Sequence, residues 1–188
     1  MGQVILCTGG ARSGKSEFAE RLALSQTGTH AYVATGQVFD EEMQDRVDKH
    51  KKRRGKAWTT YEIPYNLLAH WNGPLERDNL VLVDCLTMYV MNAFLDKELS
   101  QESANQIEES LLKEYTKLLK KIKESNQTVI FVTNELGMGI VPSEPLSRFF
   151  RDVAGKLNQL VAQEASQVYM TISGVTIELK SQEVVLHG

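Results

Sequence analysis

The sequence predicts an α/β protein in which a mostly parallel sheet is flanked by helices. Its 188 residues contain several short aliphatic runs without polar alternation, which is typical of strands buried on both faces. Longer amphipathic stretches separate these runs, as helices do in parallel βαβ units. A glycine-rich segment joins the first aliphatic run to the first helix-like stretch, the place where such proteins bind phosphates. A chain of this length is expected to form one domain over residues 1–188.

Five aliphatic runs are the expected strands, because each is rich in Val, Ile and Leu and has the length of one strand. In chain order they are Val4–Thr8, His30–Ala34, Leu80–Cys85, Thr128–Thr133 and Gln167–Ile172. Residues 173–185 are expected to form a turn and one or two further strands. The Pro- and Gly-bearing stretches Gly73-Pro74 and Gly137–Pro145 are expected to be loops within the domain.

Four stretches between these runs are the expected helices: Ser16–Ser25, Asp40–Arg54, Gln101–Ser125 and Pro145–Ala165. In the first, Phe18, Leu22 and Leu24 are expected to face inward. Acidic residues begin the second helix and basic residues end it, which complements the helix dipole at both ends. The third has apolar residues at near-helical spacing, which predicts one buried face: Ile107, Leu111, Leu118 and Ile122.

The composition excludes several classes of protein. The chain has 21 Lys and Arg against 24 Asp and Glu, so no overall basic field attracts nucleic acid or an anionic membrane. No apolar stretch approaches the roughly 20 residues of a membrane span. Cys7 and Cys85 each lie in an aliphatic run, which predicts buried, reduced thiols and a cytoplasmic protein.

The strongest motif is a phosphate-binding loop with the pattern G-x-x-x-x-G-K-S. It reads Gly9-Gly10-Ala11-Arg12-Ser13-Gly14-Lys15-Ser16. The glycines allow successive backbone N–H groups to point at phosphate oxygens, and the next helix begins there with its positive end. Lys15 can reach the β- and γ-phosphates, and the Ser16 hydroxyl can bind Mg²⁺. The motif therefore predicts binding of a nucleoside triphosphate.

Asp84 ends the third expected strand, and a carboxylate there can hold Mg²⁺ directly or through water. The alternative is a strand-end cap or a surface aspartate. A signalling GTPase is disfavoured, because its base-reading Asn-Lys-x-Asp motif is replaced here by Thr133-Asn134-Glu135-Leu136.

His50 lies in the basic half of the expected helix Asp40–Arg54, on one broad face with Arg46, Arg53 and Arg54. This face has three interpretations: a solvated basic surface with an incidental histidine, a nucleic-acid patch, or a nucleophile toward a nucleotide phosphorus. The nucleic-acid patch is disfavoured, because the run is short and has no interleaved aromatic residues. As a nucleophile, the imidazole would be kept neutral by the neighbouring cations, which would also stabilise anionic oxygens in the transition state.

Several of these stretches together resemble a known family, the bifunctional adenosylcobinamide kinases/adenosylcobinamide-phosphate guanylyltransferases of cobalamin biosynthesis. The resemblance spans essentially the whole chain. Its matching stretches are residues 8–16, Tyr32–Thr35, Asp40–His50, Trp58 with Glu62, Thr133–Pro142 and Arg148–Gly155. The run Thr-Asn-Glu-x-Gly-Met-Gly-Ile-Val-Pro is far more specific than the phosphate-binding loop.

The resemblance implies a RecA-like P-loop NTPase fold, a homotrimer and two reactions. ATP or GTP phosphorylates adenosylcobinamide, and GTP then guanylylates a histidine that passes GMP to adenosylcobinamide phosphate. The matching histidine is His50, although Lys49 occupies the preceding position, where some members carry a second histidine. The implied nucleotide contacts beyond the loop are Ala34, Thr35, Gly36, Lys51, Lys52, Arg53, Arg54, Glu62 and Asp84.

Two other functions stay open on the residues alone. One is a P-loop kinase for another small hydroxyl compound, with no covalent nucleotide intermediate. The other is a nucleotide-dependent switch or assembly module that binds a nucleoside triphosphate without turning over a second substrate.

Overall fold

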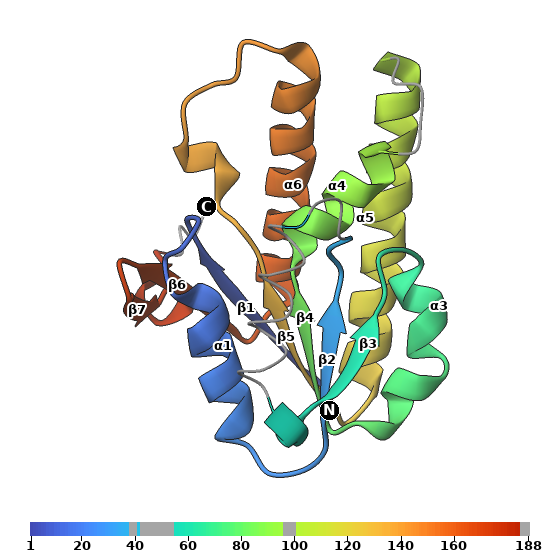
Figure 1. Ribbon diagram of the computed structural model, residues 1–188, viewed down its shortest axis with the longest axis vertical. Helices are drawn as coiled ribbons and strands as arrows, with labels where there is room; N and C mark the ends of the chain where they lie inside the picture. Colours follow the sequence, from blue (N-terminus) through green and yellow to red (C-terminus); the bar gives the residue numbers. More distant parts are fainter. Residues whose placement is uncertain (38–40, 42–54, 96–100, 185–188) are drawn as a thin grey trace.

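The computed structural model describes residues 1–37, 41, 55–95 and 101–184, except the side chains of Lys56 and Gln101. Within these residues seven strands form one sheet in the order β3-β2-β4-β5-β1-β6-β7, shown in Figure 1. All neighbouring strands are parallel except β7, which is antiparallel to β6. The strands are β1 (Gln3–Gly9), β2 (His30–Ala34), β3 (Thr59–Glu62), β4 (Leu80–Asp84), β5 (Thr128–Val132), β6 (Gln167–Ile172) and β7 (Val175–Glu178).

Helices cover both faces of the sheet (Figure 1). Helix α1 packs on one face, and α3, α4, α5 and α6 pack on the other. The α-helices are α1 (Lys15–Leu24), α3 (Leu67–Trp71), α4 (Leu86–Leu95), α5 (Gln101–Glu124) and α6 (Pro145–Glu164), and the 3₁₀ turns are η1 (Gly55–Ala57), η2 (Pro74–Arg77), η3 (Leu136–Met138) and η4 (Lys180–Gln182). No helix in the described part of the chain is long and apolar enough to cross a membrane.

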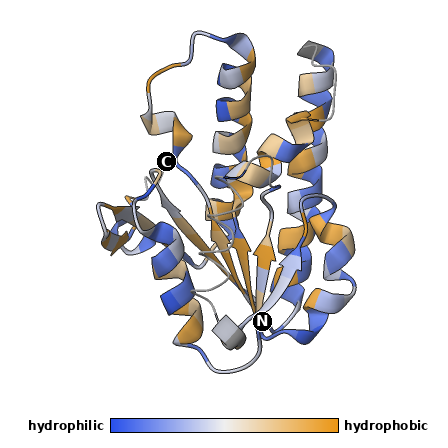
Figure 2. Ribbon diagram, in the orientation of Figure 1, coloured by the Kyte–Doolittle hydropathy of each residue, from blue (hydrophilic) through white to orange (hydrophobic). Residues whose placement is uncertain are grey.

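The core lies on both faces of the central strands, whose hydrophobic residues are flanked by helices with polar outer surfaces in Figure 2. Alternate residues of a strand point to opposite faces. In β1, Ile5 and Cys7 therefore join the apolar cluster under α1, while Val4 and Leu6 join the cluster under α5 and α6. This two-sided burial explains why the central strands are aliphatic throughout.

The five strands expected from aliphatic runs are present, with ends that differ by one residue or less, and β7 follows the expected turn. Both cysteines are buried and free, as expected. The prediction of which side chains of α1 face inward is partly wrong. Leu24 is 48% exposed, while Ala19 and Ala23 are fully buried against the sheet. Small side chains at this spacing let the helix axis lie close to the strands. With the alanines facing the sheet, Leu24 lies on a more exposed side of the helix.

Among the strands and α-helices of the described residues, β3, α3 and α4 were not predicted. Strand β3 is an edge strand of mostly exposed residues, so it has no aliphatic run. Helix α4 directly follows β4 and is itself largely buried and apolar, so its sequence merges with that of the strand. The expected helix Asp40–Arg54 lies outside the described residues, apart from Glu41.

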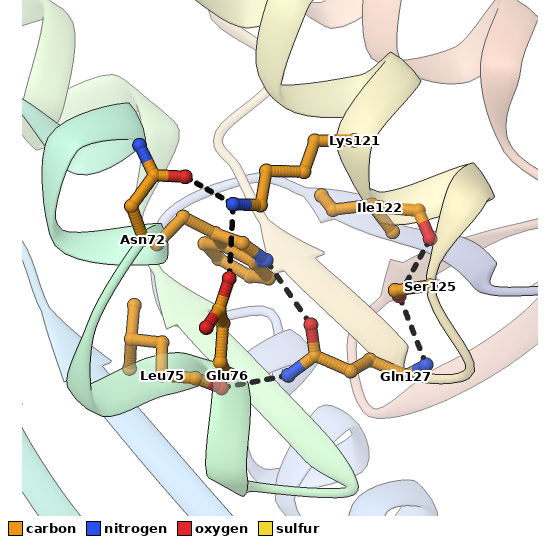
Figure 3. A network of polar contacts seen from close by, with 8 residues as sticks. Asn72, Leu75, Glu76, Lys121, Ile122, Ser125 and Gln127 are labelled. Carbon is orange, nitrogen blue, oxygen red and sulfur yellow. Dashed lines mark hydrogen bonds and ion pairs between the residues drawn. The ribbon is translucent and has the colours of Figure 1, made fainter.

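The buried side-chain amide of Gln127 makes three hydrogen bonds at the amino-terminal end of the sheet. The Nε2 of Gln127 donates to the carbonyls of Leu75 (2.7 Å) and Asp78 (2.8 Å), and its Oε1 accepts from the Trp71 indole (3.1 Å). Figure 3 shows the bond from Gln127 to the Leu75 carbonyl, together with the ion pair between Lys121 and Glu76. The contacts join the α3–η2 segment to the start of β5, at the end of the sheet opposite the phosphate-binding loop.

Candidate nucleotide-binding site

The carboxyl ends of the parallel strands bring most of the predicted site residues to one edge of the sheet. Glu62 of β3 is in register with Ala34 of β2, which is in register with Asp84 of β4. The phosphate-binding loop leaves β1, two strands further along the same edge. Open α/β sheets bind ligands at this edge. Residues that are far apart in sequence therefore lie in one row beside the loop.

The phosphate-binding loop has a backbone that requires glycine at two positions. Gly9 has φ 154°, and a Cβ there would lie 2.4 Å from the Thr171 carbonyl oxygen of β6. Gly14 has φ 98° and immediately precedes α1, which begins at Lys15. The first turn of α1 therefore presents its N–H groups and positive end at the loop, an arrangement that binds anions.

Two polar groups in this loop are buried. The Ser13 hydroxyl has no hydrogen-bond partner within the described residues, so it has unused capacity to bind a ligand. The Lys15 side chain folds over the loop, and its Nζ donates to the Gly10 carbonyl at 3.0 Å. Burial lowers the pKa of Lys15, and the charge of Asp84 opposes this effect. The ammonium is thus held against the loop backbone at Gly10.

Asp84 is oriented by a neighbouring tyrosine. The Tyr32 hydroxyl donates to Asp84 Oδ2 at 3.0 Å. The Tyr32 ring meets Trp58 edge-on with centroids 5.9 Å apart, and Trp58 makes a similar contact with His30 at 5.4 Å. Tyr32, packed against Trp58 in the apolar cluster under α1, thus holds this carboxylate on the α1 face, the same side as Lys15.

The residues present fit a magnesium ion. The described part of the chain has no cluster of three His, Cys, Asp or Glu side chains that would cage a metal. Magnesium in phosphate sites needs no such cage, since one or two protein oxygens, phosphates and water complete its coordination. Ser16 on the first turn of α1 and Asp84 at the end of β4 supply a hydroxyl and a carboxylate at the same edge.

Thr35 continues β2 and is fully buried. Its Oγ1 donates to the Cys85 carbonyl (2.7 Å) and accepts from the Cys85 N–H (2.8 Å). The Asn92 amide of α4 donates to the carbonyls of Thr35 (2.7 Å) and Pro64 (3.1 Å). These contacts fix the positions of Thr35 and Pro64, which lie before and after residues 38–54 in the chain. Gly36, which directly follows Thr35, is exposed.

The structure thus brings together the loop residues, Ser16, Ala34, Thr35, Gly36, Glu62 and Asp84 at one edge. Their contacts with nucleotide stay predictions. His50, Lys51, Lys52, Arg53 and Arg54 lie outside the described residues. Sequence reasoning missed the roles of Tyr32 and Asn92, because each acts through a contact more than 25 residues away in sequence.

Comparison with known proteins identifies relatives over nearly the whole chain. The family model for cobinamide kinase/cobinamide phosphate guanyltransferase, CobU, matches residues 5–179. The bifunctional adenosylcobalamin biosynthesis proteins CobU of Escherichia coli and Salmonella typhimurium are each 36% identical over 181 residues, which cover 94% of this chain and 99% of the relative. The corresponding CobP of Pseudomonas aeruginosa is 38% identical over 177 residues, covering 94% and 97%.

Proposed function

This chain belongs to the cobinamide kinase/cobinamide phosphate guanyltransferase family, and we propose that it catalyses both reactions in succession. It phosphorylates adenosylcobinamide with ATP or GTP, and it then transfers GMP from GTP to the product, giving adenosylcobinamide-GDP. The observation that carries the proposal is the phosphate-binding loop, with Lys15 buried over it and Asp84 beside it, in a chain that its relatives match over 94% of its length.

In the kinase step, the loop amides and Lys15 bind the triphosphate and stabilise the charge that develops on the γ-phosphoryl group. The substrate hydroxyl attacks the γ-phosphorus and releases its proton to water, and the bond from that phosphorus to the bridging oxygen breaks, so that the nucleoside diphosphate leaves. Ser16 and Asp84 would hold Mg²⁺, which when bound would neutralise charge on the triphosphate. Tyr32 keeps the Asp84 carboxylate in place for this role.

In the guanylyltransferase step, we assign His50 as the nucleophile, on the resemblance of residues 40–50 to the family pattern. Its ring nitrogen attacks the α-phosphorus of GTP, a P–N bond forms, and pyrophosphate leaves. A phosphate oxygen of the cobinamide phosphate then displaces the imidazole and takes the GMP. Lys51, Lys52, Arg53, Arg54 and Glu62 are the proposed GTP contacts, together with Ala34, Thr35 and Gly36.

The resemblance also supports a homotrimer of chains that each form one nucleotide-binding domain, in the cytoplasm. Light scattering tests the trimer directly, because a trimer would have three times the chain mass of 21.1 kDa.

Labelled GTP tests the proposal. With α-³²P-GTP and Mg²⁺, the wild-type protein should take up an acid-labile, alkali-stable label, and His50→Ala should not. His70→Ala is the matched control, because His70 is exposed on α3 and its ring contacts a backbone carbonyl, that of Asn66, so it should label normally. Equal labelling of wild type and His50→Ala would contradict the assignment. Transfer of γ-phosphate without any α-label would instead favour a kinase that has no covalent intermediate.

A further inference from the structure

A closed ring of hydrogen bonds holds the chain just after β5. The Asn134 N–H donates to Thr87 Oγ1 at 2.9 Å, and the Asn158 amide donates to the Asn134 carbonyl at 3.2 Å. The hydroxyl of Thr133 donates to Asn158 Oδ1 at 2.8 Å, and the Thr87 and Thr133 hydroxyls are 3.3 Å apart. Both backbone groups of Asn134 are therefore held by side chains, one from α4 and one from α6.

The direction of each bond in the ring follows from the number of protons available. Each threonine hydroxyl has one proton. Since Thr133 gives its proton to Asn158, the contact between the hydroxyls must be a donation from Thr87 to Thr133. Reversing the Asn158 amide would set its oxygen against the Asn134 carbonyl, so the amide orientation is also determined. Each hydroxyl donates once and accepts once, in one rotational sense, so the bonds reinforce one another.

The ring lies in the core, and the segment that it holds is next to the phosphate-binding loop. Thr87, Thr133 and Asn158 are 7%, 0% and 8% exposed, and such buried polar groups are costly unless every partner is present. On the other side of the same segment, the Thr133 N–H donates to the Cys7 carbonyl (3.0 Å) and the Glu135 N–H to the Gly9 carbonyl (3.2 Å). Figure 1 shows this stretch beside the end of β1. Asn134 and Glu135 are thus clamped between two helices and the first residue of the phosphate-binding loop.

We propose that Thr87, Thr133 and Asn158 are positioning residues that set the Asn134–Glu135 segment against the phosphate-binding loop for phosphoryl transfer. The inference rests on the proposed kinase activity. Within the described residues, the side-chain hydrogen bonds of these three reach Asn134 and one another and none reaches the loop, while the triphosphate is bound by Lys15 and the loop amides. Loss of the ring therefore slows transfer more than it weakens ATP binding. A purely structural network would lower stability and leave the two kinetic constants of the folded enzyme unchanged.

The test compares Thr87→Val, which keeps the shape but removes the hydroxyl, with Thr87→Ser, which keeps the hydroxyl. Gln127→Leu is the matched control, because Gln127 is a buried polar side chain with three hydrogen-bond partners and lies directly before β5, at the opposite end of the sheet. We expect Thr87→Val to lower kcat for transfer to adenosylcobinamide by about tenfold, or more, with KM for ATP changed by less than about twofold. Thr87→Ser and Gln127→Leu should keep kcat within about twofold of the wild type.

Hydrogen exchange of the Glu135 amide supplies a readout independent of activity. Its exchange should accelerate by about tenfold in Thr87→Val and stay at the wild-type rate in Gln127→Leu. Equal kcat in these two variants, a Thr87→Ser enzyme as slow as Thr87→Val, or an unchanged Glu135 exchange rate would each overturn the proposal. If Thr87→Val does not fold, Thr133→Val and Thr133→Ser replace the pair; failure of both valine variants to fold, with Gln127→Leu folded, would indicate a structural role alone. A wild-type enzyme without phosphoryl transfer would contradict the proposed function, while the exchange rates would still decide the role of the ring.

Discussion

The turn from β1 into the phosphate-binding loop has no room for a side chain at Gly9. A Cβ added there would lie 2.4 Å from the Thr171 carbonyl oxygen and 2.8 Å from Ser13 Oγ. The carbonyl belongs to the backbone of β6, which is paired with β1 at this residue, so it cannot rotate away as a side chain would. The φ of 154° adds strain for any residue with a Cβ. Gly9→Ala must therefore shift either β6 or the loop.

The magnitude follows from these two effects. Backbone strain costs about 1–3 kcal/mol and forced overpacking about 1–3 kcal/mol, so Gly9→Ala should destabilise the fold by roughly 2–6 kcal/mol. For a chain of this size, each kcal/mol lowers the thermal midpoint by about 2–4 °C, which predicts a fall of roughly 4–24 °C. Urea unfolding followed by circular dichroism measures the free energy, and ATP titration of the folded variant should show weaker binding.

Gly10→Ala is the matched control, because a Cβ at Gly10 meets nothing within 4 Å. It should be neutral or slightly stabilising, since alanine restricts the unfolded chain by about 0.4–1 kcal/mol. If Gly9→Ala is as stable as the wild type, or if the two alanine variants lose equal stability, the close approach of β6 is not what requires glycine.

Three further predictions concern the site and the core. Lys15→Ala should lower kcat/KM for ATP in the kinase reaction by about 100-fold, because it removes the cation buried over the loop, and unchanged turnover would contradict that role. Tyr32→Phe should raise the Mg²⁺ concentration needed for half-maximal kinase rate by about tenfold, since Asp84 loses its orienting hydrogen bond; an unchanged Mg²⁺ titration would exclude this. Burial raises the pKa of Cys7 and Cys85 from 9.0 to about 12, so neither thiol should react with a disulfide reagent at about pH 8 until the chain is unfolded. Because deprotonation is easier in the unfolded chain, stability should fall as the pH rises from 9 toward 12, and equal stability across that range would contradict the assignment.

Parts of the molecule built from contiguous residues could be predicted from the sequence. The run from β1 through the loop into α1 depends on neighbouring residues, and the spacing of its glycines, lysine and serine is enough to predict a role for each. The central strands could be predicted for a similar reason. Strands buried on both faces are aliphatic throughout, and that pattern is local.

Elements with a weak local pattern could not be predicted. Strand β3 reads Thr59-Thr60-Tyr61-Glu62, and it forms because the exposed edge of β2 accepts it, not because it is aliphatic. In α1 the choice between Leu24 and the alanines as the buried face depends on how closely the helix approaches the sheet. The residues of β3 do not specify its partner strand, and the residues of α1 do not specify how closely it approaches the sheet.

The sequence by itself determined the kind of fold and the chemistry of its phosphate-binding loop, because hydrophobic periodicity and a contiguous motif act over a few residues. Tertiary structure alone decided which polar groups hold that chemistry in place. Tyr32 reaches Asp84 across 52 positions, and Thr87 reaches Asn134 across 47. A hydroxyl group does not specify its partner until the chain has folded. Such bonds therefore form only when parallel strands end at the same edge of the sheet and helices pack beside that edge.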